Sequence, residues 1–272
     1  MNEIVVENLT RDYGGGKGIF DLSFQVGAGE VFGFLGPNGA GKTTTIRHLM
    51  GFIRPKAGKC TIRGLDCWAQ SSQIQKNLGY IPGELGFFED MTGTEFLDFT
   101  VKYRGLTEEN RRKELLDRFE LNPKGKIKKM SKGMKQKLGI VAAFLHDPEI
   151  LVLDEPTSGL DPLMQSRFVQ LLGEEKSRGK TILLSSHIFE EVERTCTRIG
   201  IIRQGRLAAV DSVEALRERH LRTYQVTLPT EESARAFARD FGGSCQGRQV
   251  TVSARQSLED IFMHYYGGEE NG

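Results

Sequence analysis

Short apolar runs, separated by glycine, proline and charged residues, recur along most of the chain. Residues 31–35 and 150–153 form nearly continuous apolar runs, and residues 181–187 form another that ends in a histidine. Strands that are apolar throughout suit a parallel sheet covered on both faces. Residues 4–6 and 20–26 also predict strands, which we assign to an N-terminal antiparallel β subdomain. The pattern therefore predicts an α/β fold.

The period changes to that of helices between about residue 91 and residue 121. Two apolar helical faces are expected there: Phe96, Phe99, Thr100 and Tyr103 form one, and Leu115, Leu116 and Phe119 form the other, behind Thr107 as the N-cap. Ser131 is expected to cap a further helix, whose face carries Leu138, Val141, Ala142 and Leu145. These helices predict a helical subdomain, about residues 86–145, inserted into the sheet domain.

A smaller pattern follows the helix expected at residues 213–220. It predicts a strand at 224–228, a helix with Ala234 and Ala238 on its apolar face, a strand at 249–252 and a last helix from Ser257. We therefore expect a main domain of residues 1–215 and a small α+β domain of residues 216–272.

Composition and charge are those of an ordinary soluble protein. The 272 residues are 38% hydrophobic and 27% charged, with a formal net charge of +1, so no global charge calls for a nucleic acid. Residues 140–145 are too short an apolar run to cross a bilayer, which takes about 20 residues, and residues 1–4 do not predict a signal peptide. The four scattered cysteines favour reduced thiols over disulfides or zinc.

Residues 36–43 fit the P-loop pattern G-x-x-x-x-G-K-[ST], between an expected strand and an expected helix. Glycines in this pattern let backbone N–H groups turn toward phosphate oxygens, and the positive end of the helix dipole faces the anion. Lys42 can reach the β and γ phosphates, and the Thr43 hydroxyl can bind Mg²⁺. The predicted nucleotide contacts are Gly36, Pro37, Asn38, Gly39, Ala40, Gly41, Lys42, Thr43 and Thr44. This predicts a P-loop NTPase core.

Polar residues end two of the apolar strands. Asp154 and Glu155 follow residues 150–153, and His187 ends the run 181–187. Ligands of open α/β sheets sit at the carboxyl ends of the strands, so these side chains are expected at the same edge as the P-loop. We expect Asp154 to hold Mg²⁺ and Glu155 to be the general base for an attacking water. His187 is a candidate contact of the γ-phosphate.

Two features leave alternatives open. Tyr13 could stack on an adenine ring or pack beside the sheet. The lysines between Lys124 and Lys137 could mark a nucleic-acid patch. That run lacks interleaved aromatic residues, which favours a solvated or phosphate-facing surface instead.

In this order, the motifs resemble those of the ATP-binding cassette (ABC) ATPases that power membrane transporters. The resemblance covers roughly residues 4–210. It places residues 131–136 at the signature motif, residues 158–161 at the loop that touches a partner subunit, and His187 at the switch histidine. It implies that Ser131, Lys132, Gly133, Met134 and Asp161 of one subunit complete the ATP site of another. It also favours the adenine-stacking role for Tyr13.

Two departures from the family pattern matter. The usual signature Leu-Ser-Gly-Gly-Gln here reads Met-Ser-Lys-Gly-Met at residues 130–134. The usual glutamine after residues 80–82 is replaced by Gly83, followed by Glu84. Glu84 is a candidate for the missing contact with Mg²⁺ or water, with a solvent-exposed Glu84 as the alternative. Both spellings are similar to a branch that exports drugs, antibiotics, lipids or sodium.

The resemblance implies that the chain is the ATP-binding and ATP-hydrolysing subunit of a membrane transporter. The expected direction of transport is export. Its expected ligands are ATP and Mg²⁺, and its expected partners are an integral membrane permease and a second ATPase subunit, with no nucleic acid. It would lie at the cytoplasmic face of the membrane, held by the permease. The alternative is a non-transport ATPase of this class that acts on ribosomes or DNA. Such proteins usually have two cassettes in one chain or a long coiled coil between the P-loop and the signature motif, and the sequence between Lys42 and Ser131 shows no heptad pattern.

Overall fold

The computed structural model describes residues 2–106, 110–219, 221–255 and 257–267. The chain divides into two compact units, Met1–Val210 and Asp211–Gly272. Sequence reasoning placed its boundary after residue 215, within helix α8 (Val213–Arg219). The expected N-cap Thr107 lies outside the described residues.

A six-stranded sheet forms the centre of the first unit. Parallel pairing joins β3 to β8 and β9, β8 to β7, and β7 to β6. Every residue of β3, β7 and β8 is buried, as their continuous apolar runs predict. In spatial order the strands are β10 (Arg206–Ser212), β9 (Arg198–Arg203), β3 (Val31–Leu35), β8 (Thr181–Ser186), β7 (Ile150–Asp154) and β6 (Leu78–Ile81).

A second, antiparallel sheet contains the N-terminal strands. Its order is β2 (Lys17–Gly27), β1 (Asn2–Gly14), β4 (Ala57–Ile62) and β5 (Leu65–Asp66). Phe24 of β2 joins the two sheets, because its ring stacks on Phe32 and on Phe34 of β3 with centroids 5.4 Å apart in each pair. The mixed α/β fold with an N-terminal antiparallel subdomain confirms the fold class predicted from the sequence.

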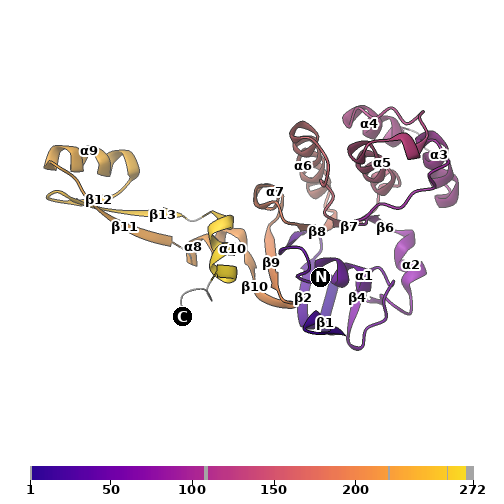
Figure 1. Cartoon of the computed structure of the whole chain (residues 1–272), viewed down its shortest axis with the longest axis horizontal. Helices are drawn as coiled ribbons and strands as arrows, with labels where there is room; N and C mark the ends of the chain where they lie inside the picture. The colour runs from indigo at the N-terminus through magenta and orange to yellow at the C-terminus, as the bar shows by residue number, and fades with distance from the viewer. Residues whose placement is uncertain (1, 107–109, 220, 256, 268–272) are drawn as a thin grey trace. The chain divides into compact units, whose positions relative to one another are not determined.

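Helices α1 (Lys42–Leu49), α2 (Ser71–Lys76), α6 (Pro162–Ser177) and α7 (Phe189–Thr195) belong to the same unit. The other helices of the first unit are α3 (Gly93–Arg104), α4 (Asn110–Arg118), the 3₁₀ turn η1 (Ile127–Lys129) and α5 (Lys132–Phe144). Figure 1 shows α3, α4 and α5 grouped together on the side of the central sheet where its edge strand β6 lies. Thr92 and Glu95 form a capping box at α3, Ser131 caps α5 as expected, and Asp161 caps α6.

The aromatic face predicted for α3 faces outward. Leu97 is the fully buried side chain of this helix, whereas Phe99 is 46% exposed and Tyr103 is 80% exposed. Phe88, in the loop before α3, is also exposed and packs edge-on against Phe99 with centroids 6.0 Å apart. These rings therefore form an exposed aromatic surface.

Lysines between Lys124 and Lys137 contact residues 89–90 in the loop before α3. Lys126 donates to the Asp90 carbonyl at 2.6 Å, and Lys135 pairs with Glu89 at 3.1 Å. Lys128 pairs with the Asp90 carboxylate at 3.0 Å. These contacts lie at the surface, where ion pairs contribute little stability each, so the run is a solvated face that also holds residues 89–90.

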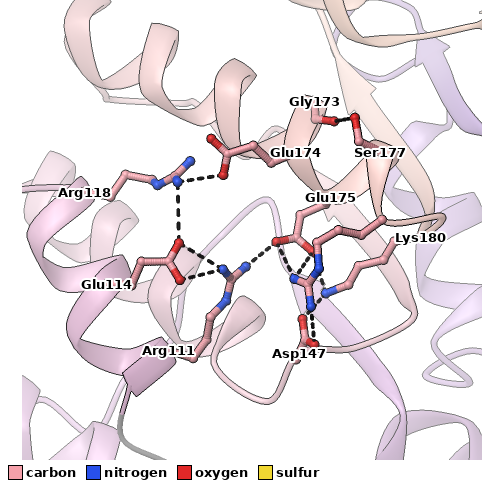
Figure 2. Close-up of polar contacts among 10 residues, drawn as sticks. Arg111, Glu114, Arg118, Asp147, Gly173, Glu174, Glu175, Ser177 and Lys180 are labelled. Atoms are coloured by element: carbon pink, nitrogen blue, oxygen red, sulfur yellow. Dashed lines mark hydrogen bonds and ion pairs between the residues drawn. The ribbon is translucent and has the colours of Figure 1, made fainter.

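An ionic cluster around a buried glutamate connects α4 to the carboxyl-terminal end of α6 (Figure 2). Glu175 is only 1% exposed, and its carboxylate contacts Arg111 of α4, Arg178 at 3.2 Å and Lys180 at 2.5 Å. Asp147 pairs with two of these cations, Arg178 and Lys180. Burial alone would raise the pKa of the Asp147 carboxyl, but hydrogen bonds from Arg178 and Lys180 outweigh it and lower this pKa to about 2.

Replacing Glu175 by alanine should destabilise the protein by about 1–3 kcal/mol, because the largely buried Arg111 and Lys180 each lose one of their two carboxylate partners. The matched control is Glu174→Ala, one position earlier, which removes a 2.7 Å pair between Arg118 and a half-exposed carboxylate. That change should cost less than about 1 kcal/mol. Urea unfolding measures both, and equal shifts of the two midpoints would contradict the assigned role of the buried cluster.

The second unit is a small α+β structure. Its sheet has the order β11 (Leu221–Thr227), β13 (Gln249–Arg255) and β12 (Ser244–Gln246), with antiparallel pairing. Helix α9 (Glu231–Phe241) packs Ala234 and Ala238 against Val250. Helix α10 (Leu258–Gly267) contacts α8, and Ser257 accepts a hydrogen bond from the Asp260 amide at 3.1 Å, as a cap does. None of the helices in the described ranges is long and apolar enough to span a bilayer.

Candidate active site

The P-loop lies between β3 and α1, at the carboxyl end of the central strand. Gly36 is required by close packing, since a Cβ there would lie 2.7 Å from the Ile202 carbonyl oxygen. Gly41 has a φ of +114°, which side chains rarely adopt, and the next residue begins α1. The two glycines let the loop turn tightly into the amino end of a helix, the geometry that binds phosphate.

Lys42 reaches back over this loop and is only 5% exposed. Its Nζ donates to the Gly36 carbonyl oxygen at 2.5 Å and to the Pro37 carbonyl oxygen at 3.3 Å. It also forms an ion pair with Glu155 Oε1 at 3.1 Å. The loop thus holds a positive charge directly beside the predicted general base.

Asp154 ends β7 and is completely buried. Its Oδ1 accepts a hydrogen bond from the Ser185 hydroxyl, while Oδ2 is buried without a hydrogen-bond partner. A Cβ at Gly83 would lie 3.0 Å from that Oδ2. An unpartnered buried carboxylate oxygen suits a hard cation such as Mg²⁺. The described residues contain no group of three His, Cys, Asp or Glu placed to hold a metal, but Mg²⁺ takes many of its ligands from water and phosphates.

Glu155 has a strained backbone, with a φ of +49°. Its N–H donates to the Ser185 carbonyl oxygen at 3.1 Å, which fixes the residue against β8. Its carboxylate contacts Lys42 through Oε1 and His187 Nδ1 through Oε2, the latter at 2.5 Å. A conformation of this kind costs roughly 1–3 kcal/mol, and the contacts that fix it hold the Glu155 carboxylate between Lys42 and His187.

Glu155 borders a cavity of about 740 Å³ together with P-loop residues. Its lining residues are Asn38, Thr43, Arg47, Phe52, Tyr80, Pro82, Gly83, Glu84, Glu155, Ser158 and His187. Burial, and then the charge of Asp154, raises the pKa of the Tyr80 phenol to about 12, so it stays protonated near neutral pH. The cavity therefore combines P-loop residues with Glu155 and His187, as the shared sheet edge predicts, whereas Asp154 is not among its lining residues.

Other predicted contacts lie elsewhere in the chain. Tyr13 is 52% exposed near the end of β1, with the Arg11 guanidinium 5.4 Å from its ring centroid. Ser131, Lys132, Gly133 and Met134 lie at the start of α5 and are not among the residues that line the cavity. Lys132 Nζ donates to the Ser158 hydroxyl at 3.1 Å, so the predicted signature loop packs on its own Ser158–Gly159 turn.

Sequence reasoning missed the residues that support the acidic pair. Ser185 hydrogen-bonds Asp154 and also accepts from the Glu155 N–H at 3.2 Å. Gln136 of α5 donates to the Pro156 carbonyl oxygen at 2.6 Å. A polar pair, Ser185 and Ser186, at the end of an otherwise apolar strand was the one available signal for the first of these contacts.

The profile of the ABC transporter family matches residues 19–158, just over half of the chain. The chain belongs to the ABC transporter family. It is 38% identical over 234 residues to the bacitracin transport ATP-binding protein BcrA of Bacillus licheniformis, covering 85% of this chain and 76% of that protein. It is 36% identical to the Nod factor export ATP-binding protein I of Rhizobium sp. (strain N33), covering 81% of this chain and 75% of that protein.

Solved structures agree with the sequence comparisons. An ATP-binding subunit of an ABC transporter superposes with a TM-score of 0.77 at 30% identity, covering 97% of this chain and 99% of that one. The chain is therefore an ATP-binding and ATP-hydrolysing ABC transporter subunit. The relatives do not favour the alternative of an ATPase that acts on ribosomes or DNA.

Replacing Glu155 by glutamine should lower ATP turnover about 10²- to 10⁴-fold, the usual contribution of a general base. ATP binding should remain, since the amide keeps the shape of the side chain and removes its negative charge from the phosphate site. Phosphate release and nucleotide binding measure the two effects. Glu190→Gln, on the exposed face of α7, should hydrolyse ATP normally. Near wild-type turnover in Glu155→Gln would show that another group takes the proton.

Proposed function

We propose that this ATPase energises an exporter, working at the cytoplasmic face of a membrane while bound to a separate permease. The names of its relatives, one for bacitracin transport and one for Nod factor export, support this role. The observation that carries the catalytic part is the contact of Glu155 with both Lys42 and His187 beside the P-loop. The exposed rings of Phe88, Phe99 and Tyr103 are the surface we assign to the permease.

We further propose that ATP is bound between two copies or two related subunits. Residues 36–44 of one subunit would surround the phosphates, with Tyr13 stacked on the adenine. Ser131, Lys132, Gly133, Met134 and Asp161 of the facing subunit would close the site. The position of α5's amino end outside the subunit's own cavity supports this arrangement.

Hydrolysis would then depend on the residues around Glu155. Phosphates carry more negative charge than one carboxylate, so we expect Lys42 to leave Glu155 for the β and γ phosphates. The freed Glu155 oxygen can accept a proton from a water, while His187 keeps the other oxygen in place. Mg²⁺ held by Asp154 and Thr43 would supply positive charge for the phosphates.

A subunit mixture tests the two-subunit site. Lys42→Ala removes the P-loop cation, and Ser131→Arg blocks the signature loop, so each variant alone should be inactive. A mixture should recover part of the activity, since a mixed dimer holds one intact site out of two. The specific activity of the wild type should also rise with protein concentration in the dilute range. Activity proportional to concentration throughout, without recovery in mixtures, would favour a site within one chain.

Glu84 is our candidate to replace the usual glutamine. It is exposed and lines the same cavity as Thr43 and Glu155. Gly83 does not have a positive φ; its Cα instead lies so close to Asp154 that a side chain would press on Oδ2. The close approach explains the glycine better than backbone freedom does. It also leaves residue 84 as the next position that can supply an oxygen.

Glu84→Ala should raise the Mg²⁺ concentration needed for half-maximal hydrolysis several-fold, because a carboxylate oxygen near the metal is lost. Glu84→Gln should restore most of the affinity, since it supplies the neutral oxygen that the family uses at this loop. Phe88→Ser serves as the contrasting variant and should keep the basal rate while losing stimulation by a permease. An unchanged Mg²⁺ titration in Glu84→Ala would leave Glu84 as a solvent-exposed residue.

A further inference from the structure

Glu191 lies on α7, behind the catalytic pair, and is only 5% exposed. Its Oε2 accepts two hydrogen bonds, from the Ser186 hydroxyl at 2.7 Å and from the Thr157 hydroxyl at 3.2 Å. Ser186 immediately precedes His187, and Thr157 is two positions after Glu155. One carboxylate oxygen therefore joins the two segments that carry the catalytic residues.

Both segments are fixed further through the same two residues. The Ser186 hydroxyl accepts a hydrogen bond from the Ile188 N–H at 3.0 Å while it donates one to Glu191. The residues before and after His187 are therefore connected to each other. The Thr157 carbonyl oxygen accepts the Leu160 N–H at 3.0 Å, which shapes the turn toward Asp161. A change at Glu191 would thus reach the His187 segment and the loop after Glu155 together.

The setting of Glu191 is unusual for a residue that serves stability alone. Its Oε1 is buried without a hydrogen-bond partner, and both bonds to Oε2 come from uncharged hydroxyls. Burial is the main cause that raises the pKa of this carboxyl to about 7, and the charge of Glu155 acts in the same direction. Burying such a carboxyl group costs free energy on folding. Buried titratable groups with shifted pKa values are common at active sites.

We propose that Glu191 is a positioning residue for ATP hydrolysis, holding Glu155 and His187 in mutual contact. The contact to be held is the 2.5 Å approach of His187 Nδ1 to Glu155 Oε2. The backbone of Glu155 has a φ of +49°. Such a strained conformation persists only where the surrounding structure fixes it. Ser185 fixes the amide of Glu155 on one side, and Glu191 fixes Thr157 on the other.

The test compares Glu191→Ala, Glu191→Gln and the neighbouring control Glu190→Ala. Glu191→Ala should lower kcat about 10- to 100-fold, the effect of a misplacement near 1 Å, with KM for ATP changed by less than about twofold. Glu191→Gln should stay within about threefold of the wild type, because its amide oxygen accepts the same two hydroxyl bonds. Glu190→Ala should match the wild type. A kcat in Glu191→Ala within twofold of the wild type, or a Gln variant as slow as the Ala variant, overturns the proposal.

Two further variants separate positioning from folding. Thr157→Val removes one of the two hydroxyl bonds in a conservative way, and it should lower kcat even if Glu191→Ala does not fold. In a Glu155→Gln background, adding Glu191→Ala should cause little further loss, because the base that Glu191 positions is already absent. An additive loss there, or an equal loss of ATP binding, would show a general structural defect and refute a positioning role.

Discussion

The parallel register of β3, β8 and β7 is the constraint on which the site depends. Pairing sets Leu35 opposite Ser186 and Asp154 opposite Ser185, so all three strands end at the same level. The P-loop leaves β3 there, the acidic pair leaves β7, and His187 leaves β8. A slip of either pairing by one residue would turn every side chain of the shifted strand to the opposite face. Because both faces of these strands are buried, the apolar pattern alone does not exclude such a slip, and polar contacts at the strand ends, such as the hydrogen bond from Ser185 to Asp154, fix the register.

Much of this architecture follows from local patterns in the sequence. Continuous apolar runs identify the buried strands, and Ser131 was recognisable as an N-cap because capping depends on residues within one turn. Positions that depend on distant partners could not be read in this way. Glu175 meets Arg111, which is 64 positions away in the chain, and Glu191 meets Thr157, which is 34 positions away. No local period encodes such pairs.

The outward aromatic face of α3 shows a related limit. Spacing correctly places Phe99 and Tyr103 on the same side of that helix, but spacing does not say which side meets the protein. The helix instead buries Leu97, while Phe99 stacks with Tyr103 at 6.0 Å between centroids. A helix that borders two surfaces, one internal and one exposed, has more apolar residues than its core contact requires. For such a helix, the pattern predicts the element and leaves the direction of its faces open.

The altered signature is explained by the turn against which it packs. Lysine replaces the usual glycine at position 132, and its stem lies over Gly159, where a Cβ would come within 3.0 Å of Lys132 Cγ. Gly159 has a φ of +82° and no side chain, so the longer residue fits without displacing the loop. The Lys132 ammonium then reaches Ser158, which lines the cavity beside Glu155 and His187. The start of α5 is thereby joined to the loop that follows Glu155 in its own chain.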